Sequence, residues 1–70
     1  MGIFNNKQKN LARSMEQQEL ESAVQQSKSA LHMAVDSGDK KLLQQAIKTH
    51  TNYERALFYK NTYPQDRRKK

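Results

Sequence analysis

The chain has 70 residues, a net charge of +6 and only 34% apolar residues. This length allows one small domain, whose core alone rarely stabilises a fold, so we expect self-association to add stability. The lack of cysteine excludes disulfides and thiolate metal sites. No apolar run is long enough for a signal peptide or a membrane-spanning helix, and we therefore expect a cytoplasmic protein.

The N-terminal residues 1–10 are polar, and we expect them to be flexible. Two residues are candidate caps of a first helix: Asn10, and Ser14 with Gln17 three positions later, which is the capping-box pattern. The following residues are mostly good helix formers without Gly or Pro. The sequence predicts a helix over about residues 11–36.

A turn signal follows at Gly38 and Asp39. Gly suits the left-handed residue just past a helix end, and Asp suits the cap of the next helix. A second helix is predicted over about residues 40–62, because the residue before Pro64 is disfavoured in helical geometry. Residues 11–62 would form the helical domain, and residues 63–70 a basic disordered tail.

Two apolar stripes with alternating steps of four and three residues lie on either side of this turn, as on one face of a helix. The two stripes match position by position, because the residue numbers of each pair sum to 77. The pairs are Leu20 with Leu57, Val24 with Tyr53, Ser27 with His50, Leu31 with Ala46, and Ala34 with Leu43. This pattern predicts an all-α fold built on an antiparallel two-helix hairpin.

Further apolar residues flank the stripes and would widen each helix surface enough to pack a second hairpin. The expected product is a homodimer in the form of a two-fold symmetric four-helix bundle. The residues of this expected partner or dimer face are Ala23, Ala30, Leu42, Ile47 and Phe58.

The polar pair Ser27 and His50 has two interpretations. A hydroxyl opposite an imidazole in a helical interface usually satisfies a buried polar atom and sets the register of the helices. The same residues, with Glu54 one turn from His50, are also the elements of a nucleophile, base and orienting acid. Because no glycine-rich loop supplies an oxyanion site, we expect the structural role and not catalysis. The two histidines, His32 and His50, would lie at different heights along a hairpin and could not share an ion, so we expect no metal site, and we expect no cofactor.

Basic residues concentrate where a hairpin would bring its two chain ends together, next to a stretch that holds four of the five aromatic residues. Basic groups mixed with aromatic rings are typical of surfaces that bind a phosphate backbone and stackable bases. The candidate contacts for an anion or nucleic acid are Lys7, Lys9, Arg13, Lys60, Arg67, Arg68, Lys69 and Lys70.

These features predict a small non-enzymatic interaction or regulatory module that docks through helical faces, with a homodimer and a protein partner. The alternative is a nucleic-acid-binding dimer that uses the basic end. In size, expected hairpin shape and basic character, but in no diagnostic motif, the chain is similar in architecture to the Rop-type dimeric bundles that bind paired RNA loops, and the alternative rests on this architectural analogy alone. A membrane partner is not expected, because the basic tail has no adjoining amphipathic face for insertion.

Overall fold

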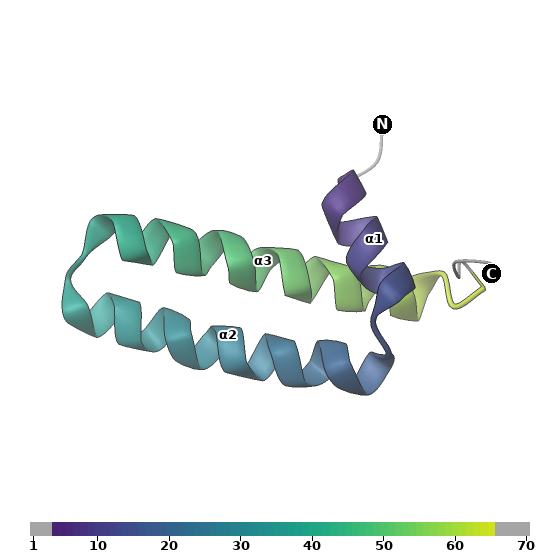
Figure 1. Cartoon of the computed structure of the whole chain (residues 1–70), viewed down its shortest axis with the longest axis horizontal. Coiled ribbons are helices and arrows are strands. Elements are labelled where there is room, and N and C mark those ends of the chain that lie inside the picture. The colour runs from purple at the N-terminus through teal and green to yellow at the C-terminus, as the bar shows by residue number, and fades with distance from the viewer. Residues whose placement is uncertain (1–3, 66–70) are drawn as a thin grey trace.

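The computed structural model describes residues 4–65, which form three helices and no strand. The helices are α1 (Asn6–Ser14), α2 (Gln17–Ser37) and α3 (Lys40–Thr62). The helical class predicted from the sequence is confirmed for these residues. Figure 1 shows α2 and α3 lying side by side in opposite directions, while α1 turns away from their axis and crosses α3 near its C-terminal end.

The N-terminal part of the fold differs from the expected flexible segment 1–10 and single helix 11–36. The first helix begins at Asn6, and its cap is Asn5 rather than Asn10 or Ser14. The Asn5 side chain accepts a hydrogen bond from the Gln8 backbone N–H at 2.8 Å, and the Gln8 side chain accepts one from the Asn5 N–H at 3.1 Å. This reciprocal pair is a capping box, which stabilises the first turn of α1.

The expected first helix is interrupted at Met15 and Glu16, which both adopt extended backbone conformations. Ser14 does not cap α2; its hydroxyl donates to the Asn10 carbonyl oxygen at 2.8 Å. Glu19 instead accepts from the Glu16 N–H at 2.9 Å at the start of α2. The break has a packing reason, because it lets α1 cross α3 and bury Ala12 there.

The turn between α2 and α3 is made by Gly38 and Asp39. Gly38 has a φ of 75°, the left-handed conformation that L side chains disfavour. Asp39 caps α3 by accepting hydrogen bonds from the backbone N–H groups of Lys41 and Leu42 at 3.0 and 3.2 Å. α3 ends at Thr62, two residues before Pro64.

The core lies at the end of the molecule where α1 crosses α3. Its buried members are Ala12, Leu20, Ala56 and Tyr59, and Leu20 is the one large side chain of the described residues that is fully buried. Lys60 links α3 to α1 at this crossing, because its ammonium group donates a hydrogen bond to the Ala12 carbonyl oxygen at 2.8 Å. Because two of the four core residues are alanines, this core buries little apolar surface.

None of the helices within residues 4–65 combines the length and the apolar character that a membrane crossing requires.

Candidate functional site

The interface between α2 and α3 contains a polar layer halfway along its length. The Ser27 hydroxyl lies 2.8 Å from Nδ1 of His50, and Nε2 of His50 lies 3.5 Å from a carboxylate oxygen of Glu54. Ser27 is buried and Glu54 is exposed. The imidazole therefore spans the distance from the helix interface to solvent.

The direction of the hydrogen bonds in this layer bears on its chemistry. The Ser27 hydroxyl donates to the Val24 carbonyl oxygen at 2.9 Å. A hydroxyl has only one hydrogen. While Ser27 donates it to Val24, Ser27 can only accept a hydrogen bond from His50, and this requires the imidazole tautomer that carries its proton on Nδ1. An activated serine nucleophile requires the reverse, with its proton directed at the imidazole. This arrangement satisfies the polar atoms of the interface.

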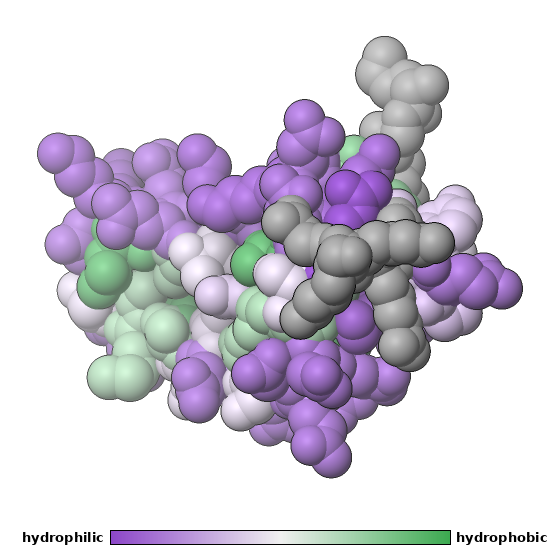
Figure 2. Space-filling model, turned by 45° about the vertical axis from the view of Figure 1, so that its right-hand side comes forward, coloured by the Kyte–Doolittle hydropathy of each residue, from purple (hydrophilic) through white to green (hydrophobic). Residues whose placement is uncertain are grey.

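A small groove, here called the turn-side groove, lies between α2 and α3 in the half of the molecule that contains the turn. Its volume is about 220 Å³. Figure 2 shows apolar surface gathered at this end of the molecule. None of the six lining residues is charged, and these residues are Ser27, Ala30, Leu42, Gln45, Ala46 and Thr49.

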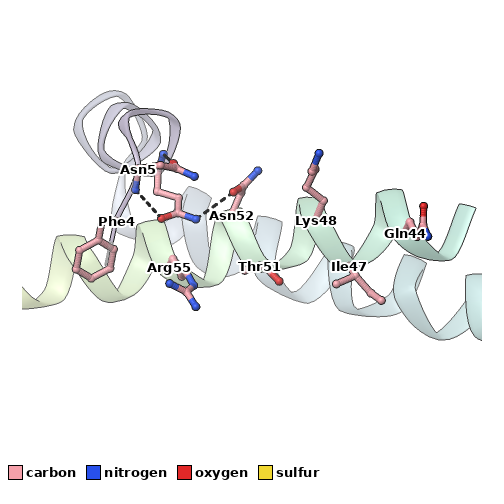
Figure 3. A pocket seen from close by; sticks show the side chains of 9 residues that line it. Phe4, Asn5, Gln44, Ile47, Lys48, Thr51, Asn52 and Arg55 are labelled. Atoms are coloured by element: carbon pink, nitrogen blue, oxygen red, sulfur yellow. Dashed lines mark hydrogen bonds between the residues drawn. The ribbon is translucent and has the colours of Figure 1, made fainter. Parts of the chain in front are cut away.

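A larger groove of about 690 Å³, here called the α3 groove, follows α3 away from α2. Figure 3 shows Ile47, Thr51 and Arg55 following one another along the helix, with Phe4 beside Arg55 at the end of the row. Lys48 stands on the opposite edge. The groove thus combines apolar side chains with two positive charges.

The α3 groove continues into a neighbouring groove of about 650 Å³, because Phe4 and Arg55 line both. Phe58, which is 57% exposed, lies in this second groove together with Val24 from α2. The ring of Phe4 packs against Phe58 at 5.8 Å and against Tyr59 at 5.1 Å between centroids. Phe4 therefore forms the boundary between the two grooves.

The five residues of the expected partner face occupy different surfaces. Ala30 and Leu42 line the turn-side groove, while Ile47 and Phe58 line the two grooves that share Phe4. Ala23 is half-buried on α2.

The candidate basic contacts fall partly within the described residues. Lys7 is exposed on α1, Lys9 and Arg13 are half-buried there, and Lys60 is half-buried near the end of α3. Since α1 crosses this part of α3, the fold brings the four residues to one end of the molecule. Lys60 also holds the Ala12 carbonyl. Arg67, Arg68, Lys69 and Lys70 lie outside the described residues.

Of the residues that line the α3 groove, the sequence predicted only Ile47 as a contact; Phe4, Gln8, Asn52 and the two charged residues Lys48 and Arg55 were not expected there. Gln8 is only 4% exposed, and its amide donates to the Asn52 side-chain oxygen at 3.1 Å, which fastens α1 to α3. The spacing of Asn5 and Gln8 is a capping-box signal that would have located α1. No local pattern pairs Gln8 with Asn52, which is 44 residues away.

Comparisons of the chain with protein-family models, curated proteins and solved structures find no match.

Proposed function

We propose that the chain is a small non-enzymatic interaction module that docks through the apolar surfaces of α2 and α3. We further propose that these helices form a stable helical hairpin whose first partner is a second copy of the same chain.

One observation carries this proposal: the described residues expose more large apolar side chains than they bury. Of the residues between positions 4 and 65, only Leu20 and Tyr59 are large apolar residues in the buried core. Six others are about half exposed or more, namely Met33, Val35, Leu42, Ile47, Phe58 and Tyr63. Apolar surface left in water by so small a fold is a source of binding energy for a partner.

The turn-side groove supports a second copy as the first partner. A chain with a net charge of +6 repels its own copies, so an interface between them favours an uncharged surface. The turn-side groove has no charged residue among the described residues that line it. In a two-fold symmetric pair, Leu42 of each copy can fill the recess left by Ala30 and Ala46 of the other.

The substitution Leu42→Glu tests this association. Leu42 is 47% exposed, so the monomer tolerates the change, whereas a carboxylate in an apolar interface opposes dimerisation. We expect the unaltered chain to sediment as a dimer and the variant as a monomer at the same concentration. Circular dichroism of the variant should still report a helical chain.

Ser29→Glu is the matched control, because it also introduces a glutamate. Ser29 is an exposed residue of α2 that does not line the turn-side groove. We expect this control to remain dimeric. A monomeric unaltered chain at every concentration tested, or dimers of equal stability in both variants, would contradict the proposed association.

A second candidate function, nucleic-acid binding, is favoured by the packing of α1 across α3. This packing carries Lys7 and Lys9 to the same end of the molecule as Lys60. Binding of this kind weakens steeply as salt rises, and each lost phosphate contact lowers the slope by about one unit. A combined Lys7→Gln and Lys9→Gln variant whose salt slope for RNA is unchanged would argue against it.

A further inference from the structure

The α3 groove has a chemical character that differs from that of the turn-side groove. Among its nine lining residues within residues 4–65, Lys48 and Arg55 are charged, both positively, and none is acidic, whereas the neighbouring groove is lined by Glu54 as well as Arg55. Phe4 and Ile47 supply apolar surface, and Ile47 is 47% exposed. A ligand with both an apolar side and negative charge would therefore complement this groove.

The charges along the whole of α3, and not only those in the groove, also favour a negatively charged partner. α3 contains five basic residues and one acidic residue, Glu54. α2, by contrast, contains one basic residue and three acidic residues. An acidic partner would be attracted to the α3 side of the molecule and repelled by the α2 side, which sets its orientation on approach.

The length of the surface points to a helix as the occupant. The α3 groove and its neighbour share Phe4 and Arg55 and together follow α3 from Gln44 to Asn61. At 1.5 Å per residue this stretch is about 26 Å long, the length of a helix of four to five turns. Ile47 lies toward one end of this stretch and Phe58 toward the other. Apolar side chains spaced along one face of a docking helix could contact both.

We propose that the α3 groove binds an acidic amphipathic helix of a partner protein. The apolar face of that helix lies on Ile47 and Phe4, while its carboxylates lie near Lys48 and Arg55. This inference rests on the proposed function and adds to it the surface and the chemical class of the partner.

The fold gives α1 a part in this binding. Phe4 precedes α1 and is held in place by the Asn5–Gln8 capping box and by the bond from Gln8 to Asn52 (Figure 3). Loss of that bond would free the end of the groove without touching the apolar or basic residues of α3. The groove is therefore complete only when α1 is docked.

The test uses synthetic peptides and the full chain. The first peptide is a helix-forming sequence with Leu at positions i, i+3, i+4 and i+7 and Glu on its other face. The second has the same composition in scrambled order, and the third keeps the apolar face but replaces Glu with Lys. NMR chemical shifts of the backbone amides of the isotopically labelled chain, followed during titration with each peptide, report both the affinity of the peptide and the residues that it contacts.

We expect only the first peptide to bind saturably, with shifts concentrated around residues 44–61 of α3 and around Phe4. Ile47→Glu should weaken this binding about tenfold or more, which corresponds to about 1.4 kcal/mol. Ser29→Glu, which adds a negative side chain on α2, should leave the affinity within about twofold, because it lies outside the groove. Lys48→Glu, at an exposed position, provides a second groove variant should Ile47→Glu fail to fold.

Several results would overturn the inference. Equal binding of the scrambled acidic peptide would mean that the surface attracts any polyanion, nucleic acid included. Shifts at the turn-side groove, or an unchanged affinity in both groove variants, would place binding elsewhere. If Ile47→Glu abolished self-association of the chain without peptide, the occupant would be a second copy.

The outcome for the inference is separable from that of the proposed function. A chain that forms dimers sensitive to Leu42→Glu but binds no acidic peptide would refute the inference alone. A monomeric chain would refute the proposed association whatever the peptide result.

Discussion

At the scale of single residues, buried amides and alanines decide the arrangement. Gln8 is 4% exposed, and its side-chain amide makes hydrogen bonds to Asn5 and Asn52. These bonds offset the free-energy cost of burying a polar amide. The sequence presents Gln8 as one polar residue among many near the N-terminus. Its role follows from a contact with a residue 44 positions away, which local patterns do not reveal.

Gln8→Ala should therefore destabilise the fold by about 1–2 kcal/mol, because it removes two hydrogen bonds and leaves the Asn52 side chain without its partner. Urea unfolding followed by circular dichroism measures the change. Gln17→Ala is the control, since Gln17 is exposed and bonds only to Glu21 on the same helix. Equal effects of the two substitutions would show that the Gln8–Asn52 contact does not hold α1.

At the scale of helices, the interruption at Met15 and Glu16 has the largest consequence. The residues from Asn10 to Ser37 contain no Gly or Pro, and intrinsic propensity would allow one continuous helix. A continuous helix would project α1 into solvent along the axis of α2. The break instead buries Ala12 against α3 and places Phe4 beside Phe58. Tertiary packing overrides propensity at this point.

Ala12→Leu tests the docking of α1. Ala12 is 1% exposed, and the larger side chain should cost about 1–3 kcal/mol through overpacking. We expect the backbone amides of α1 to exchange with solvent faster in this variant, while those of α2 and α3 near the turn keep their protection. Lys7→Leu, at an exposed position of α1, should leave the exchange of α1 unchanged. Identical exchange in both variants would contradict a docked α1.

At the scale of the whole molecule, a small core and several exposed apolar residues occur together. Within residues 4–65 the buried apolar residues are Ala12, Leu20, Ala34, Ala56 and Tyr59. Three of these five are alanines, which bury little area, so the free energy of unfolding of a single chain should be low. Association through exposed apolar surface would add stability by mass action.

The midpoint of thermal unfolding should therefore rise with protein concentration. For the unaltered chain we expect a shift of several degrees per hundredfold increase in concentration, and no shift for Leu42→Glu. Scanning calorimetry or circular dichroism at two concentrations measures it. A concentration-independent midpoint for the unaltered chain would be evidence against a stabilising dimer.

The sequence by itself determined the helical class, the position of the turn signal and the residues of the two stripes. These follow from local chemistry: Gly38 allows the left-handed conformation, Asp39 can cap a helix, and the stripe spacing places Ser27 level with His50. Only the tertiary structure decided where α1 lies, that Gln8 bonds to Asn52, and that Ile47 and Leu42 line different grooves. The physical reason is that helix periodicity is a local property of the sequence. It predicts which residues share one face of a helix, but not which other part of the chain packs against that face.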